Sequence, residues 1–99
     1  MGHAAYSIDR QRIAWDEIDG ETLIINAETG YYFSLDGVGS LIWGMLAEGL
    51  DERDIIARIV DEYEVQESTA RDDLQALVAA LIGEDLVDRI GHEERAQTR

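Results

Sequence analysis

Alternating apolar and polar residues mark the start of the folded region. Two such runs, 12–18 and 21–26, lie on either side of the dipeptide Asp19-Gly20. Side chains alternate across a strand, so a period of two residues is typical of a half-buried strand. Aspartate followed by glycine supplies the positive φ angles of a tight hairpin turn. The pattern therefore predicts two antiparallel strands joined at this turn.

A third strand is predicted at 31–35, after a short turn that contains Gly30. We expect this glycine to adopt the left-handed conformation. The strand leads directly to Asp36, whose carboxylate is a candidate acceptor for the free amide hydrogens at the start of a helix. Three strands joined by short turns form an antiparallel meander, whose first and last strands are edges unless another segment covers them.

Apolar residues then change to helical spacing. Over 37–48 they recur at i, i+3, i+4, i+7 and i+8, which makes one full face of a helix. Asp51 is a candidate N-cap for a second helix that ends near Tyr63. After a break at 64–66, a third helix carries a further apolar face, and we expect it to end near Gly83.

The order of three strands followed by three helices predicts an α+β fold. Because a short turn joins the last two helices, our first expectation is a winged helix-turn-helix-like architecture. We expect the folded domain to cover 12–90, with flexible segments at 1–11 and 91–99, since both ends are polar. Ninety-nine residues are enough for one such domain and its core.

Charge restricts the class of partner. The chain has 22 Asp and Glu residues against 8 basic residues, which gives a formal net charge of −14. Proteins that bind nucleic acid gain much of their affinity from contacts of Lys and Arg with phosphates, so this charge argues against nucleic acid and anionic membrane surfaces. It would instead attract a cationic segment of a partner. No apolar run approaches the ~20 residues of a membrane span, so we expect a cytoplasmic protein.

No set of side chains in the sequence is typical of catalysis or of metal binding. The only two histidines, His3 and His92, lie near the polar ends of the chain, and cysteine is absent. Neighbouring carboxylates such as Asp72 and Asp73 point to different faces of a helix. Helix capping explains the acidic residues around Asp51 better than a cation site does. We therefore expect a protein that is not an enzyme and that has no cofactor or metal.

The aromatic strand is the strongest indication of function. Tyr31, Tyr32 and Phe33 alternate across the pleat, so at least one tyrosine leaves the face that Phe33 uses. One interpretation is ordinary packing of the sheet. The other is that the outer edge of this strand receives an extended peptide, with free N–H and C=O groups supplying affinity and neighbouring side chains supplying specificity.

Short motifs in the same region resemble the PqqD-like family, whose members are grouped as recognition elements for ribosomally synthesised and post-translationally modified peptides (RiPPs). The resemblance covers about 15–87. It rests most on the motif Thr29-Gly30-x-Tyr32-x-x-Leu35-Asp36, on the Ile42-Trp43 pair that follows, and on a closing L-x-x-x-x-L-V pattern that ends at Val87. Two positions depart from the family pattern, because Asp36 stands where Asn is common and Tyr31 replaces a lysine.

The resemblance implies a domain that binds the leader segment of a precursor peptide and catalyses no reaction itself. It implies that the domain presents this peptide to a maturation enzyme, such as a radical SAM enzyme, a cyclase or a leader peptidase. The leader would add as a strand beside the third strand and lie against the third helix. Carried onto this chain, the implied peptide-binding residues are Tyr31, Tyr32, Phe33, Ser34, Arg71, Leu74, Gln75 and Val78.

Three alternatives stay open at this point. Arg71 either pairs with leader carboxylates or answers a neighbouring acid such as Glu67. The fold also permits a DNA-binding winged-helix regulator, although Arg71 is the only basic residue of the third helix. In a structural homodimer, a second copy would occupy the edge of the third strand.

Overall fold

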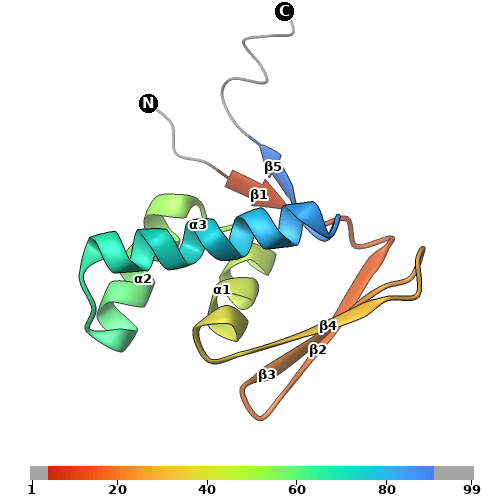
Figure 1. Ribbon diagram of the computed structural model, residues 1–99, viewed down its shortest axis with the longest axis horizontal. Coiled ribbons are helices and arrows are strands. Elements are labelled where there is room, and N and C mark those ends of the chain that lie inside the picture. Colours follow the sequence, from red (N-terminus) through yellow and green to blue (C-terminus); the bar gives the residue numbers. More distant parts are fainter. Residues whose placement is uncertain (1–4, 91–99) are drawn as a thin grey trace, which may run out of the picture.

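Five strands and three helices follow one another in the part of the chain that the structure describes. The structure is a computed structural model that describes residues 5–90, so His3, His92 and the segment 91–99 lie outside the described residues (Figure 1). The strands are β1 (Ala5–Ser7), β2 (Ile13–Ile18), β3 (Glu21–Asn26), β4 (Tyr32–Asp36) and β5 (Asp88–Ile90), and the helices are α1 (Gly37–Ala47), α2 (Glu52–Tyr63) and α3 (Glu67–Gly83). Within residues 5–90, every helix is too short or too polar to cross a membrane. The expected α+β fold, a three-stranded antiparallel sheet followed by three helices, is confirmed.

The sheet has the strand order β2-β3-β4 and a regular antiparallel register. At its first turn, Asp19 and Gly20 have φ angles of 56° and 80°, and Gly30 at the second turn has a φ of 82°. Both turns therefore have the left-handed backbone that the sequence predicts. In the second turn, the side-chain oxygen of Asn26 accepts a hydrogen bond from the backbone N–H of Glu28 at 2.9 Å. This bond helps to fix the direction in which β4 leaves the turn.

Helix α1 begins at the residue after β4 and is largely buried. Asp36 occupies the N-cap position, but its side chain makes no capping hydrogen bond. The prediction that its carboxylate caps this helix is therefore wrong. The reason is that Asp36 is also the last residue of β4, where alternation turns its side chain to the outer face of the sheet. α1 packs against β3, β4 and α2. Its buried residues are Ser40, Ile42, Trp43, Met45 and Leu46.

Helices α2 and α3 pack against each other and complete the core. Asp51 caps α2 as expected, because its Oδ1 accepts a hydrogen bond from the backbone N–H of Asp54 at 3.0 Å. Glu64, in the left-handed conformation, ends α2, and α3 ends at Gly83 as expected. The core therefore joins the inner face of the sheet to all three helices.

β1 and β5 form a two-stranded ribbon. Residues 5–7 are therefore in a strand, whereas the sequence predicted a flexible segment over 1–11. The strands pair antiparallel, with Tyr6 opposite Arg89. The Tyr6 ring is buried, and the Arg89 guanidinium lies 5.8 Å from its centroid. A ribbon of this size is at best marginally stable by itself. The ribbon is stabilised by the burial of Tyr6 in β1 and of Leu86 and Val87 just before β5.

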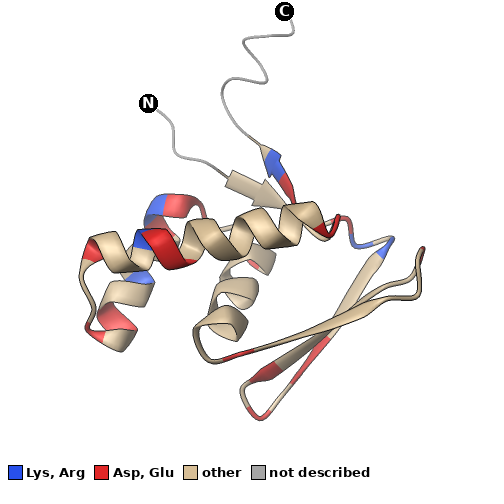
Figure 2. Cartoon of the chain, in the orientation of Figure 1, with Lys and Arg blue, Asp and Glu red and all other residues tan. Residues whose placement is uncertain are grey.

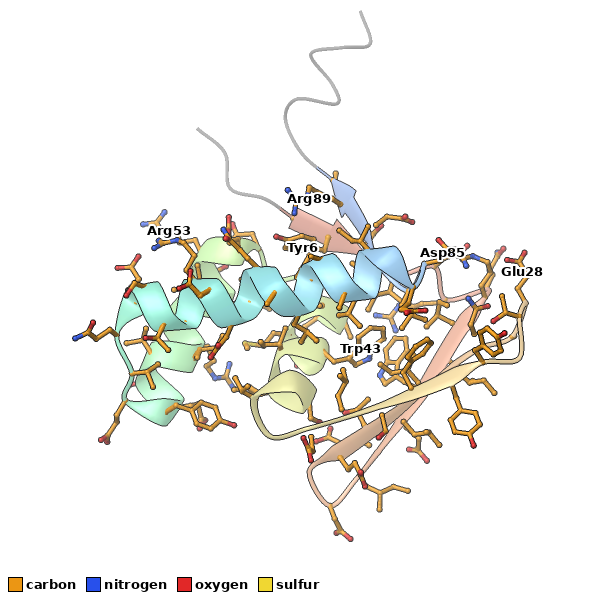
Figure 3. The ribbon with its side chains drawn as sticks, viewed as in Figure 1. Tyr6, Glu28, Trp43, Arg53, Asp85 and Arg89 are labelled. Atoms are coloured by element: carbon orange, nitrogen blue, oxygen red, sulfur yellow. The ribbon has the colours of Figure 1, made fainter. Side chains whose placement is uncertain are left out.

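Arg12 joins three separate parts of the chain at one end of the sheet. Its guanidinium lies 3.2 Å from the Asp9 carboxylate, 3.2 Å from that of Asp85 and 3.9 Å from that of Glu28. Figure 3 shows Asp85 and Glu28 at this same end of the molecule. Hydrogen bonds from the Gln11 N–H and from Arg12 lower the pKa of Asp9. Because these carboxylates are exposed, the network orients the connecting loops more than it stabilises the fold.

The buried Tyr6 predicts a loss of stability at alkaline pH. Burial, reinforced by the Glu52 carboxylate and opposed by Arg89, raises the pKa of Tyr6 above its ordinary value. The folded state therefore holds this proton more tightly, so the contribution is fully present below about pH 10 and is lost as pH rises through the raised pKa. We expect Tyr6→Phe to be close to wild type at pH 8 and to lose less stability between pH 9 and 11. Urea unfolding at both ends of this range measures the effect, and equal losses in both proteins would contradict it.

Candidate functional site

Strand β4 forms an edge of the sheet. It pairs with β3 on one side, and no strand within residues 5–90 pairs with its other side. β2 is the opposite edge, but α1 packs more extensively against β4 than against β2. Figure 1 shows β4 running directly into α1, with α3 beyond it. The β4 edge therefore lies where the sheet meets the helices.

The hydrogen-bonding groups of β4 divide between β3 and the open edge. The Asn26 N–H donates to the Tyr31 carbonyl at 2.9 Å, so these two residues form a hydrogen-bonded pair. Such pairs alternate in an antiparallel ladder, and the register then assigns Phe33 to a bonded pair with β3. The N–H and C=O groups of Tyr32 and Ser34 consequently point to the open edge. They are positioned to bond an added strand.

The side chains of β4 divide between the two faces of the sheet. Phe33 and Leu35 lie on the inner face and pack against the core, whereas Tyr32 and Ser34 lie on the outer face and are exposed. Tyr32 is 69% exposed. Tyr31, just before the strand, is also exposed. It is two residues before Phe33, so strand alternation puts both side chains on the same face of the sheet. Of the two tyrosines, Tyr31 therefore lies on the side of the sheet that faces the helices, and Tyr32 lies on the opposite side.

Gly39 of α1 lies where β4 and α3 come together. A Cβ atom at this position would lie 3.6 Å from side-chain atoms of Leu35 and 3.9 Å from Leu77 Cδ2. Leu77 is half-buried and packs against the core from α3. These contacts bring Leu77 close to the inner face of β4, although the sequence did not single it out as a site residue. Its spacing of three residues from Leu74 was the available signal, since that spacing keeps the two on neighbouring faces of a helix.

The four residues that the resemblance implied on α3 contact the core or neighbouring acidic side chains. Leu74 and Val78 are both 0% exposed, so their side chains belong to the core. The Gln75 side chain donates to Glu52 Oε2 on α2 at 3.3 Å, and Arg71 donates to Glu67 Oε2 at 2.9 Å. The second contact matches the alternative in which Arg71 answers a neighbouring acid. The structure therefore brings the β4 residues together but turns these α3 residues to the core or toward α2.

Two tryptophans pack beneath the inner face of the sheet. Their rings are 5.3 Å apart at an interplanar angle of 81°, the edge-to-face arrangement that aromatic pairs favour. Trp43 is buried between α3 and the sheet (Figure 3), and its Nε1–H has no hydrogen-bond acceptor among the described residues. The Arg10 guanidinium covers Trp15 at 4.9 Å from the ring centroid. Both rings therefore belong to the core that lies against the inner face of the sheet.

Neither β4 nor the second half of α3 carries a basic residue. Figure 2 shows acidic positions on the sheet and at the start of α3, with a neutral second half of α3. Arg71, the one basic residue of α3, is already engaged by Glu67. Among residues 5–90, no group of three His, Cys, Asp or Glu side chains could hold a metal ion. The site thus offers a backbone edge and apolar side chains.

These features define a small α+β domain with a preformed strand edge. The model of the family described as "Coenzyme PQQ synthesis protein D (PqqD)" matches residues 21–87. The chain therefore belongs to the PqqD family, as its motifs indicated. No curated protein sequence matches this chain.

Two solved structures are similar to this chain. One is TbiB1 in complex with the TbiA(beta) leader peptide, with 36% identity, a TM-score of 0.78, and coverage of 82% of this chain and 93% of that one. The other is a lasso peptide synthetase B1 complexed with its leader peptide, with 24% identity, a TM-score of 0.75, and coverage of 83% and 95%. The second likeness concerns the fold alone.

The assignment of α3 faces predicts unequal effects of alanine substitutions. Leu74→Ala removes a fully buried side chain and should lower the free energy of unfolding by about 2–5 kcal/mol. Gln75→Ala, one residue away, removes one exposed hydrogen bond and should cost less than about 1 kcal/mol. Denaturant unfolding of both variants measures the difference. Equal effects would contradict the assignment of Leu74 to the core.

Proposed function

We propose that this protein is a cytoplasmic leader-peptide-binding module that holds a ribosomally made precursor peptide for a maturation enzyme and catalyses no reaction itself. The observation that carries this proposal is the open edge of β4 beside α1. Membership of the PqqD family supports it, as does the similarity to TbiB1, whose structure holds a leader peptide.

Strand addition explains how such a module would bind. An extended leader lies antiparallel or parallel to β4 and bonds the N–H and C=O groups of Tyr32 and Ser34. These backbone bonds give affinity without reading the sequence of the peptide. Alternate leader side chains then face the inner side of the sheet, where Phe33, Leu35 and Leu77 offer apolar contacts. Specificity for particular leader residues arises there.

The two competing functions fit the structure less well. A DNA-binding winged helix needs a basic recognition helix, whereas α3 carries one arginine that is paired with Glu67. A homodimer through the β4 edge would place two chains of net charge −14 side by side. A leader peptide would use the same edge without bringing a second chain of this charge against it.

Removing one edge donor tests strand addition. Ser34→Pro deletes an N–H that points to the open edge but keeps the bonds between β3 and its partner Phe33, and proline is tolerated on such edges. The probe is the leader half of any precursor peptide that is encoded beside this protein. We expect its affinity to fall about tenfold, the effect of losing one net hydrogen bond plus some local distortion. Isothermal titration calorimetry measures this affinity.

Ser34→Ala is the matched control because it removes the side chain and keeps the N–H. Its leader affinity should stay within about twofold of wild type, since the hydroxyl lies on the outer face and carries little of the binding. Circular dichroism should show that both variants are folded. If proline and alanine weaken binding equally, or neither does, the leader does not bond the backbone of β4 at Ser34.

A further inference from the structure

The outer face of the sheet, on the side away from the helices, presents an organised surface. Alternation and register give it three rows, with one residue from each strand in each row. The rows are Ala14-Ile25-Tyr32, Asp16-Leu23-Ser34 and Ile18-Glu21-Asp36. All nine of these residues are exposed. We call these nine residues the outer face.

Large apolar side chains are concentrated on the outer face. Ile18 is 62% exposed, Leu23 48% and Ile25 40%, and Tyr32 joins them from β4. Two shallow hollows lie on this face, and both are lined by Leu23 and Tyr32. Single exposed apolar residues are common, but a contiguous group around a hollow marks an interaction surface.

The charges of the outer face indicate the chemistry of its partner. Glu21 and Asp36 lie in the row at one end, Asp16 lies beside Leu23 in the middle row, and none of the nine residues is basic. A surface that covered this face would desolvate these carboxylates, which costs free energy unless a cation is supplied. A fitting partner therefore has apolar side chains opposite Leu23 and Ile25 and has Lys or Arg opposite the carboxylates.

A second copy of this chain does not meet that requirement. Two outer faces related by a two-fold axis along β3 would place Glu21 against its own copy, Asp16 over Ser34 and Asp36 over Ile18. An axis across the strands, through the middle row, would place Asp16 against its own copy, and Glu21 and Asp36 over the row that contains Ile25. Neither arrangement gives any carboxylate a cation, so the charges select a different protein as the occupant.

The outer face also lies next to the peptide edge without overlapping it. Tyr32 and Ser34 carry their side chains on the outer face while their backbone groups point to the open edge. A strand added to β4 would extend each row by one residue and would leave the outer face uncovered. A partner can therefore bind there while the leader is in place.

We propose that the outer face is the docking surface for the maturation enzyme, which binds through an apolar surface flanked by Lys or Arg. That the occupant is this enzyme rests on the proposed function, whereas its chemistry follows from the side chains of the outer face. The enzyme would contact Leu23, Ile25 and Tyr32 with its apolar surface and pair its basic residues with Asp16, Glu21 and Asp36.

Matched variants test this proposal, with any peptide-maturation enzyme that is encoded beside this protein as the probe. Leu23→Thr keeps a strand-forming residue but removes apolar contact, and Ile90→Thr is its control, since Ile90 is 45% exposed on β5. The double variant Asp16→Asn with Glu21→Gln removes two charges, and Asp72→Asn with Asp73→Asn removes two from α3. Enzyme affinity without leader, leader affinity without enzyme, and thermal unfolding are measured for each.

We expect Leu23→Thr and the double variant on the sheet each to weaken enzyme binding about tenfold or more, as truncations in the centre of an interface do. The two controls should stay within about twofold, and the leader affinity of all four should be unchanged. Enzyme binding that is absent in the wild-type protein, or equal in all variants, would overturn the proposal. So would a wild-type dimer in sedimentation that Leu23→Thr converts to a monomer, because the occupant would then be a second copy.

Leader binding separates this inference from the proposed function. If the wild-type protein binds no leader but Leu23→Thr still loses the enzyme while Ile90→Thr does not, the docking surface stands and the proposed leader binding fails. If leader binding is normal and Leu23→Thr leaves the enzyme bound, the proposed function stands and the docking surface is wrong.

Discussion

The burial of α1 is the constraint on which the rest of the structure depends. α1 begins at the residue after β4 without a linker, and it packs against the sheet and α2 with Ile42, Trp43 and Met45 in the core. A strand joined in this way to a buried helix cannot move independently of the core. The edge of β4 is therefore formed before any peptide arrives, so binding does not have to order it.

The alternation of β4 lets five residues serve three purposes. Phe33 and Leu35 attach the strand to the core, the backbone of Tyr32 and Ser34 is presented at the open edge, and the side chains of the same two residues belong to the outer face. Each purpose uses a direction that the others leave free. Under the two proposals, this one short strand offers one surface to a peptide and another to a protein.

Local sequence signals predicted much of the fold, because turn residues and periodicity act over a few positions. Asp19-Gly20 determined the first hairpin, and the change from a period of two to helical spacing marked the passage from β4 to α1. The pairing of β1 with β5 joins segments about eighty residues apart, and three-residue strands are too short to show a period. Such long-range pairing depends on Tyr6 finding space in the core, which no local pattern indicates.

The candidate site was predictable only in part for a similar reason. The sequence indicated β4 correctly as an edge beside α1, since connectivity alone makes it the last strand of a meander. Helical periodicity identified the apolar residues of α3 but not the neighbour that each one meets. Leu74 and Val78, which the resemblance implied at the site, are core residues, while Leu77, which it did not single out, lies beside Gly39 and β4.

Amide hydrogen exchange along β4, with and without the leader peptide, tests the central claim most directly. Strand addition predicts that the leader slows exchange of the Tyr32 and Ser34 amides, which point to the open edge, and leaves that of Phe33, already bonded to β3, nearly unchanged. This alternating pattern would place the leader on the β4 backbone. Protection confined to β2, or unchanged exchange at both Tyr32 and Ser34 in the presence of saturating leader, would contradict the account.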